Sequence, residues 1–301
     1  MVKVVVLLST YNGGRYLEEQ LASLIDQKGV QIEVLVRDDG STDSTINILN
    51  KWKEGGTIEW YKGDNLRPAR SFFDLIEKAP DADFYAFCDQ DDVWLPDKLK
   101  IAVSMLSKIN CEKPSLYFGA YQMTDDKLNC IETTLRNPIL DLYHALVDNS
   151  ATGCTVVFDY KLLNAARKYS PSYITMHDDW LYLLCFALGG NVVYDNKPHI
   201  LYRQHGDNVV GGIKQSWLEK YKNRIKKVFL SGNCFRTRLA SEIIRGYSDI
   251  IPSENLKIIR DFVGYRKGLR RVYVALNFNY YRGNNIGDNI RLLVMFLTGK
   301  I

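Results

Sequence analysis

An acidic tetrad, Asp89-Gln90-Asp91-Asp92, directly follows the apolar run Phe84–Cys88. Side chains alternate along a strand, so Asp89 and Asp91 point to the same side if the extended geometry persists to Asp91. Two carboxylates that converge at the end of a buried strand repel each other unless a cation joins them. Sites built only from oxygen ligands favour Mg²⁺ or Mn²⁺ over zinc. Because such an ion commonly holds a phosphorylated ligand, the tetrad predicts nucleotide chemistry.

Strand and helix patterns alternate through the first third of the chain. Apolar runs predict strands over Val4–Leu8, Ile32–Val36, Ile58–Tyr61 and Phe84–Cys88, and apolar stripes predict helices over Tyr16–Asp26, from Ile46 to Trp52 and over Pro68–Lys78. This alternation predicts an α/β fold with a mainly parallel sheet covered by helices on both faces. Ligands bind such sheets at the carboxyl ends of the strands. Three polar clusters fall at these ends: Ser9–Asn12, Asp38–Asp43 and Asp89–Asp92.

The middle of the chain is less regular. Short strands are expected over Ser115–Tyr121, Thr155–Phe158, Asn191–Tyr194 and Ile200–Arg203, and a helix is expected over Asp179–Leu188. Earlier in the chain, Ser41 or Thr42 is expected to cap the helix that carries Ile46.

Composition places the chain among globular proteins. Of its 301 residues, 46% are hydrophobic and 25% are charged, which allows one substantial core with an appendage. Six cysteines are scattered without CxxC spacing, so neither a zinc site nor a disulfide framework is expected, and a reducing compartment is indicated. The sequence has no signal-peptide pattern and no apolar run of roughly 18 residues, so we expect a cytoplasmic or peripheral protein.

Charge divides the chain into two regions. Residues 1–212 carry 21 Lys/Arg and 29 Asp/Glu, a net of −8, whereas residues 213–301 carry 18 and 6, a net of +12. We therefore expect an α/β domain over 1–212 and a basic helical region over 213–301. An apolar stripe in the basic region is interleaved with lysines and arginines and consists of Trp217, Tyr221, Ile225, Val228 and Phe229. Docking of the stripe on the α/β domain and contact with an anionic membrane are compatible alternatives, and nucleic acid is not the expected partner.

Several sequence segments together carry a resemblance to a known family. They read VVVLLSTYNG over 4–13, VRDDGSTD over 36–43, DQDDVWLPDKL over 89–99, and HDDW over 177–180 followed by YRQH over 202–205. In this order they resemble the family 2 glycosyltransferases of the GT-A fold, and in particular the rhamnosyltransferase-like enzymes of bacterial surface polysaccharide synthesis. The resemblance implies that the α/β domain over 1–212 is a GT-A catalytic domain.

The implied reaction is an inverting transfer of a sugar from a nucleotide donor to a saccharide. The donor would be dTDP-rhamnose in the first place and a UDP-sugar in the second, with Mn²⁺ or Mg²⁺ as the cofactor. The acceptor would be a growing, lipid-linked saccharide at the cytoplasmic face of the cell membrane. The reaction releases a nucleoside diphosphate whose charge a divalent cation stabilises, so one carboxylate suffices, to deprotonate the acceptor hydroxyl.

The resemblance also implies roles for the polar clusters. Asp39 matches the acid that accepts a hydrogen bond from the pyrimidine N3–H. Asp89 matches a ribose or metal contact, and Asp91 matches the direct metal ligand. The remaining candidates are Thr10, Tyr11 and Asp38 for the nucleotide, Arg203 for the diphosphate and His205 for the metal.

Two adjacent acids compete for the role of catalytic base. Asp178 is the first candidate and Asp179 the second, because related sequences often read His-Asp-Trp-Trp and the doubled acid leaves the match open. Neighbouring helical residues diverge by about 100°, so only one of the two faces the sugar well. A helix start stabilises the charged form of a carboxylate, so a raised pKa is not expected for either acid.

Two other classes of function fit parts of the sequence. A sugar nucleotidyltransferase shares the sheet, the metal and the nucleotide. It needs a glycine-rich basic loop after the first strand, however, and residues 9–15 offer only two glycines and one arginine. A non-catalytic module that binds a sugar nucleotide or a polysaccharide would bind the donor without turnover.

Overall fold

The computed structural model describes residues 1–109, 112–205, 234–266, 270–281 and 286–301. Its central sheet has seven strands in the order β10-β6-β9-β4-β1-β2-β3. Their bounds are Lys3–Thr10 (β1), Gln31–Asp38 (β2), Glu59–Lys62 (β3), Phe84–Cys88 (β4), Ser115–Gly119 (β6), Val157–Asp159 (β9) and Asn191–Asp195 (β10). All neighbours pair in parallel except β9, which is antiparallel to both β4 and β6. The prediction of a mainly parallel sheet is confirmed.

Helices cover both faces of this sheet because its central strand β1 is apolar on both sides. Val4, Val6 and Leu8 join one apolar cluster with α1, α2 and α4. Val5 and Leu7 join a second cluster with α3, α6 and α7. These helices span Leu17–Ile25 (α1), Thr45–Glu54 (α2), Arg67–Lys78 (α3), Lys98–Leu106 (α4), Tyr160–Arg167 (α6) and His177–Ala187 (α7). The alternation of side chains along β1 therefore builds a layer on each face.

A second, smaller sheet stands beside the ends of the main strands. Its order is β5-β11-β7-β8, with bounds Val93–Trp94 (β5), Ile200–Arg203 (β11), Gln122–Thr124 (β7) and Cys130–Thr133 (β8). Of these strands the sequence predicted only β11, because strands of two to four residues give too little alternation to read. The predicted strand over Ser115–Tyr121 ends at Gly119, and the chain then enters β7.

Three local predictions need correction. The segment Thr155–Phe158 is not one strand, because a 3₁₀ turn over Gly153–Thr155 precedes β9. Neither Ser41 nor Thr42 caps α2, because the helix starts after Ser44 and the Asp43 carboxylate accepts the Thr45 backbone N–H at 3.0 Å.

A third correction concerns α7, which begins at His177 and not at Asp179. Both acids of the HDDW segment therefore lie in its first turn.

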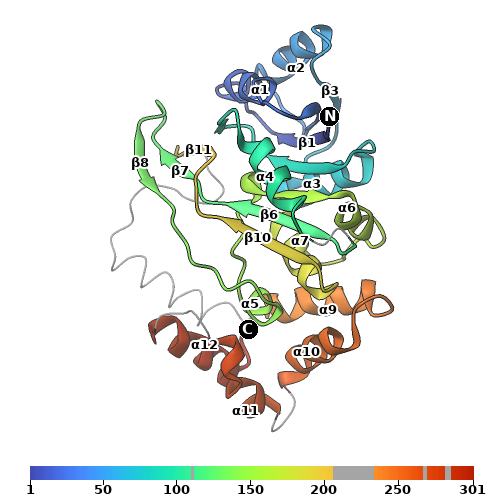
Figure 1. Ribbon diagram of the computed structural model, residues 1–301, viewed down its shortest axis with the longest axis vertical. Coiled ribbons are helices and arrows are strands. Elements are labelled where there is room, and N and C mark those ends of the chain that lie inside the picture. The colour runs from blue at the N-terminus through green and yellow to red at the C-terminus, as the bar shows by residue number, and fades with distance from the viewer. Residues whose placement is uncertain (110–111, 206–233, 267–269, 282–285) are drawn as a thin grey trace.

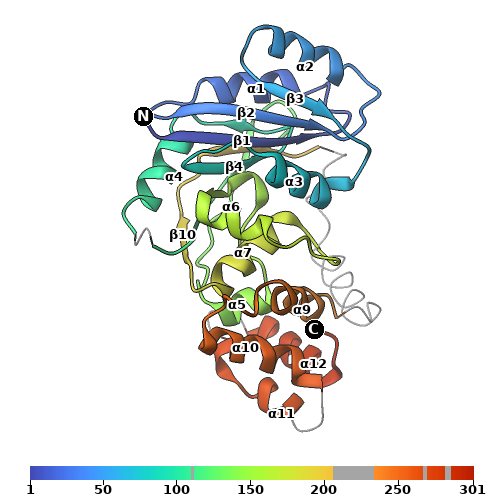
Figure 2. The ribbon, with the colours of Figure 1, turned by 90° about the vertical axis from the view of Figure 1, so that its right-hand side faces the viewer.

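The described part of the C-terminal region packs on the α/β domain. It forms α9 (Phe235–Tyr247), α10 (Ser253–Val263), α11 (Arg270–Ala275) and α12 (Ile286–Thr298). Leu239 and Ile243 of α9 share an apolar cluster with Trp180 of α7. Helices α10 to α12 lie at the opposite end of the molecule from α2 and β3 (Figures 1 and 2). The predicted stripe from Trp217 to Phe229 lies outside the described residues.

The cysteines are free thiols wherever the structure describes them. Cys88, Cys154, Cys185 and Cys234 are buried, and Cys130 is exposed. Among the described residues, no helix combines the length and the apolar character needed to cross a bilayer.

Candidate active site

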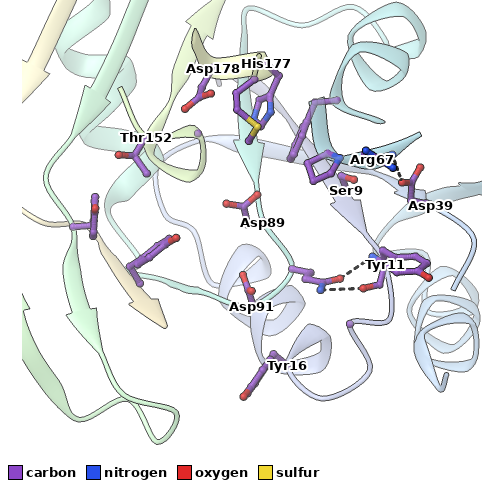
Figure 3. A pocket seen from close by; sticks show the side chains of 18 of the residues that line it. Ser9, Tyr11, Tyr16, Asp39, Arg67, Asp89, Asp91, Thr152, His177 and Asp178 are labelled. Carbon is purple, nitrogen blue, oxygen red and sulfur yellow. Dashed lines mark hydrogen bonds between the residues drawn. The ribbon is translucent and has the colours of Figure 1, made fainter. Parts of the chain in front are cut away.

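A cavity of about 1040 Å³ lies at the carboxyl ends of β1, β2 and β4. Its wall is completed by the first residues of α7 and by residues of β7 and β11. The cavity is large enough for a nucleotide and a sugar together. Figure 3 shows Asp39, Asp89, Asp91 and Asp178 around the same space.

Asp39 forms a rigid acceptor in the wall of the cavity. It is 3% exposed, and its carboxylate accepts the backbone N–H groups of Leu66 and Arg67, both at 3.0 Å. The buried guanidinium of Arg37 forms an ion pair with it. Oδ2 accepts only one hydrogen bond from the described residues, so it can accept another from a ligand.

Two residues that were predicted to contact the nucleotide form hydrogen bonds with other residues of the protein instead. Asp38 is fully buried, and its Oδ2 accepts the backbone N–H groups of Gly40 (3.1 Å) and Ser41 (3.0 Å). The Thr10 hydroxyl donates to Oε1 of Gln90 at 2.7 Å. Neither Thr10 nor Asp38 lines the cavity, so both shape the loops that carry the site.

Gln90 joins the loops that follow β1 and β4. Its Oε1 accepts the Tyr11 backbone N–H at 2.9 Å, and its Nε2 donates to the Tyr11 carbonyl at 3.2 Å (Figure 3). Tyr11 lines the cavity, as a nucleotide contact must. The side chain between the two acids therefore fixes the distance between the two loops.

Asp89 and Asp91 both line the cavity, although strand β4 ends at Cys88. Nε2 of His205 lies 2.9 Å from Oδ2 of Asp91. No hydrogen bond from another described residue reaches the Asp89 carboxylate. Burial, and then the charges of Asp91 and Asp178, raise the pKa of Asp89 to about 7. Asp89, Asp91 and His205 all line the cavity, and carboxylate and imidazole groups suit a divalent cation such as Mn²⁺ or Mg²⁺.

Asp92 and Arg203 hold this acidic loop from behind. The Arg203 backbone N–H donates to Oδ1 of Asp92 at 3.1 Å. The Arg203 guanidinium donates to the carbonyls of Asp91 (2.9 Å) and Asp126 (2.6 Å) and pairs with Glu19. It does not line the cavity. Arg203 therefore supports the loop from Asp89 to Asp92, and its guanidinium is not placed to contact a diphosphate in the cavity.

Asp178 projects from the first turn of α7 into the cavity, toward Asp89 (Figure 3). Its Oδ1 accepts the Asp179 backbone N–H at 2.9 Å, and its Oδ2 accepts from Nδ2 of Asn149 at 3.4 Å. Burial, and then the charge of Asp179, raise the pKa of Asp178 to about 6. This differs from the expectation drawn from the helix start, because loss of hydration outweighs the helix dipole here.

Asp179 is occupied by an ion pair. Nη1 of Arg236 on α9 lies 2.6 Å from its Oδ1 and 2.8 Å from its Oδ2, and the Thr175 hydroxyl donates to Oδ2 at 2.6 Å. Both carboxylate oxygens are therefore paired with groups of the protein. Of the two candidates, Asp178 is the one whose carboxylate remains available to an incoming hydroxyl.

The sequence reasoning missed several residues that complete the site. They are Arg37 beside Asp39, Gln90 between the loops, Asn149 beside Asp178, Arg236 beside Asp179, and His177 in the cavity wall. Arg37, Gln90 and His177 carried a signal, since each stands inside a motif. The others act on partners that tertiary packing brings to them.

The chain is similar to known glycosyltransferases in sequence and in fold. The family model described as Glycosyl transferase family 2 matches residues 5–153. The dTDP-rhamnosyl transferase RfbG of Shigella flexneri is 31% identical over 231 residues, which cover 71% of this chain and 77% of the relative. The glucosyltransferase WfgD of Escherichia coli, named for transfer from UDP-Glc to α-D-GlcNAc-diphosphoundecaprenol, is 28% identical over 60% of this chain and 68% of its own.

Solved structures share the fold. TarS residues 1–349 of S. aureus in complex with UDP-GlcNAc matches 99% of this chain and 82% of its own, with a TM-score of 0.58 and 18% identity. The mannosyltransferase PcManGT of Pyrobaculum calidifontis, in complex with GDP-Man and Mn²⁺, matches 98% of this chain and 79% of its own. The TM-score is 0.54 and the sequence identity is 15%. The architecture is thus that of the GT-A glycosyltransferases. By its sequence relatives, its family model and its fold, this chain belongs to glycosyltransferase family 2.

Proposed function

We propose that the protein is a metal-dependent, inverting glycosyltransferase that moves a sugar from a nucleotide donor to a saccharide hydroxyl. The observation that carries the proposal is the position of Asp178 across the cavity from Asp89 and Asp91, with the neighbouring Asp179 paired to Arg236. A carboxylate with no ion-pair partner among the described residues, opposite two further acids, is what this chemistry needs.

Asp89, Asp91 and His205 would hold Mn²⁺ or Mg²⁺. When bound, the cation supplies charge stabilisation for the departing nucleoside diphosphate. Arg203 and Asp92 keep the loop in place from behind. The Mn²⁺ in the PcManGT complex supports a cation in this fold.

Asp39 and Tyr11 would hold the nucleotide. The free acceptor capacity of Asp39 Oδ2 suits the N3–H of a pyrimidine base. We infer dTDP-rhamnose as the first candidate donor, because RfbG is named as a dTDP-rhamnosyl transferase. A UDP-sugar is the second, because WfgD is named for UDP-Glc.

Asp178 would act as the base. Its carboxylate takes the proton of the acceptor hydroxyl while that oxygen forms a bond to C1 of the sugar. The bond from C1 to the diphosphate oxygen breaks on the opposite face, and its electron pair leaves with the nucleoside diphosphate. The configuration at C1 is therefore inverted, and no second flanking carboxyl group is required.

The acceptor would be a lipid-linked saccharide at the inner face of the cell membrane. The name of WfgD gives its acceptor as α-D-GlcNAc-diphosphoundecaprenol, and this supports a lipid-linked saccharide as the acceptor. We define an apolar C-terminal surface that runs from α11 through the 3₁₀ turn Phe278–Tyr280 to α12. Its exposed members are Val272, Tyr273, Leu276 (just after α11), Phe278, Ile286, Ile290 and Leu297. Exposed Arg270 and Arg291 lie on the same helices. Apolar side chains with arginines beside them suit an anionic bilayer better than a second copy, whose arginines would repel them.

Incubation of the purified protein with Mn²⁺ and a panel of dTDP- and UDP-sugars tests the proposal. We expect release of nucleoside diphosphate with saccharide present, and loss of this release in Asp178→Asn. Release of pyrophosphate would identify a nucleotidyltransferase. Donor binding without turnover in the wild-type protein would identify a binding module.

A further inference from the structure

We infer that Arg236, on the C-terminal helix α9, is a positioning residue for the transfer reaction and holds the catalytic base through two separate neighbours. The inference rests on the proposed role of Asp178. It makes the C-terminal region a structural part of the active site and not only an appendage.

Arg236 is fully engaged in a buried position. Arg236 is 2% exposed and Asp179 is 5% exposed. Nη1 binds both oxygens of Asp179, at 2.6 and 2.8 Å. Nε donates to the Leu146 carbonyl at 3.0 Å, and Nη2 donates to the carbonyls of Ala145 and Asp148. The guanidinium therefore joins the start of α7 to the end of α5 (Leu142–Val147).

These two attachments lead to the two oxygens of the base. Oδ1 of Asp178 accepts the backbone N–H of Asp179, which Arg236 binds through its side chain. Oδ2 of Asp178 accepts from Asn149, which directly follows Asp148, and Arg236 binds the carbonyl of Asp148. Both residues that bind the Asp178 carboxylate are thus held by the Arg236 guanidinium: Asp179 directly, and Asn149 through the neighbouring Asp148.

Charge gives a second reason for the arrangement. Asp179 directly follows Asp178 in the sequence, and Asp89 lies across the cavity from Asp178. Without Arg236, the Asp179 charge would be buried and uncompensated beside Asp178. Asp179 would then move or take up a proton, and either change would displace the start of α7.

A purely structural ion pair makes a different prediction, and α9 supplies a matched control. Glu242 is also buried on α9, at 4% exposure, and accepts hydrogen bonds from Tyr169 and Ser172, each at 2.8 Å. It fastens the same helix to the loop before α7 but does not contact Asp178 or Asp179. Arg236→Met and Glu242→Met each remove one buried charge from α9.

Steady-state kinetics of the full-length variants, at a temperature where circular dichroism shows both to be folded, tests the inference. We expect kcat of Arg236→Met to fall about 10²-fold, the loss typical of a displaced catalytic group. Its affinity for the nucleoside diphosphate with Mn²⁺, measured by calorimetry, should stay at the wild-type value. Glu242→Met should keep the wild-type kcat. Replacing Asp179 by Asn in the Arg236→Met background should recover part of kcat, because the uncompensated charge is removed.

Wild-type kcat in folded Arg236→Met would overturn the inference and leave the proposed function standing. Equal losses of kcat in the two methionine variants would also overturn it. Failure of the wild-type protein to turn over any donor would instead count against the proposed function. If Arg236→Met does not fold, Arg236→Lys decides, because it keeps the charge but cannot reach both Asp179 and the carbonyls of α5. Its kcat should fall about tenfold, and an unchanged value would refute the positioning role.

Discussion

At the scale of single residues, adjacent acids at the start of α7 have opposite environments. Asp179 is neutralised by Arg236, whereas the hydrogen-bond partners of Asp178 among the described residues are neutral groups such as the Asn149 amide and the Asp179 backbone N–H. A carboxylate with neutral partners in a poorly hydrated place holds its proton more tightly than one in water. This environment suits the proposed role of Asp178 as a general base, whose pKa should lie near the working pH.

The first prediction concerns pH. The pKa of Asp178 is raised to about 6, and the base must be deprotonated to accept a proton. We therefore expect kcat/KM to be constant above about pH 7 and to fall about tenfold per unit below about pH 6. Rates at saturating Mn²⁺ between pH 5 and pH 8 measure this, with nucleotide affinity at each pH as the control. An inflection near pH 4 would contradict the assigned environment of Asp178.

The second prediction concerns the metal. Asp91→Asn removes a charged ligand, so we expect activity to fall about 10²-fold or more and its dependence on added Mn²⁺ to weaken. Titration of EDTA-treated enzyme with Mn²⁺ measures both effects. Asp125→Asn is the control, since Asp125 lies in an exposed turn and accepts from Asn129. Full turnover by the Asp91→Asn variant would show that Asp91 is not a metal ligand.

At the scale of elements, Arg37 fixes the junction between β2 and α3. Besides Asp39, its guanidinium binds Asp74 at 2.9 Å, Ser71 at 3.2 Å and the carbonyl of Asp64 at 2.9 Å. The loop that presents Asp39 to the cavity is therefore held by β2, which precedes it, and by α3, which the Arg37 guanidinium binds.

The third prediction tests this junction. Arg37→Met leaves two carboxylates without their buried partner, so we expect the free energy of unfolding to drop by about 3 to 5 kcal/mol. The affinity for the nucleotide should fall as well, because Asp39 loses its position. Lys78→Met is the matched control: Lys78 also binds Asp74, at 3.0 Å, but its side chain is 53% exposed. That variant should lose less than about 1 kcal/mol. If urea denaturation gave the same decrease in unfolding free energy for Arg37→Met and Lys78→Met, the assigned role of Arg37 would be contradicted.

At the scale of the whole molecule, one apolar cluster runs from the sheet through α7 into the C-terminal helices. Tyr265, Tyr280 and Phe296 belong to the same cluster as Phe72 and Trp180. The other side of α12 is different, because Ile286, Ile290 and Leu297 are exposed at spacings of four and seven residues. Such residues lie on one face of a helix, so α12 has an apolar face toward the core and another toward the outside.

The fourth prediction concerns the membrane. Phe278→Ser with Ile286→Ser removes side chains that are 81% and 79% exposed, so folding should be unaffected. We expect affinity for vesicles that contain anionic lipid to fall about tenfold or more, since a large apolar side chain contributes about 1.5 to 3 kcal/mol when fully buried. Sedimentation with vesicles measures it. Ile131→Ser with Leu135→Ser, at 49% and 71% exposure outside this surface, is the control. Equal binding by both double variants would exclude this surface.

Sequence alone determined the layers of the fold and the strand ends at which the site lies. Strands such as Val4–Leu8 and Phe84–Cys88 are long apolar runs, and their polar clusters follow them directly, so local pattern was enough. The sequence also pointed to Asp39, Asp89, Asp91 and Asp178, which the structure brings to one cavity, because each stands inside a motif whose order along the chain matches the family. Short strands such as β5 and β7 were missed, because they exist only through pairing with β11.

Tertiary structure alone decided which acids remain available to a ligand. Asp178 and Asp179 are adjacent acids in the sequence, and the contact of Asp179 with Arg236, 57 residues further along, makes their surroundings different. Arg203 matched a phosphate contact by motif, yet its hydrogen bond to the carbonyl of Asp91, 112 residues away, turns it into a support. The physical reason is the same in both cases. A buried charged side chain binds the partner that the fold places beside it and is then not available to a ligand. That partner is often far away in the sequence, so the residues around the charged side chain do not reveal it.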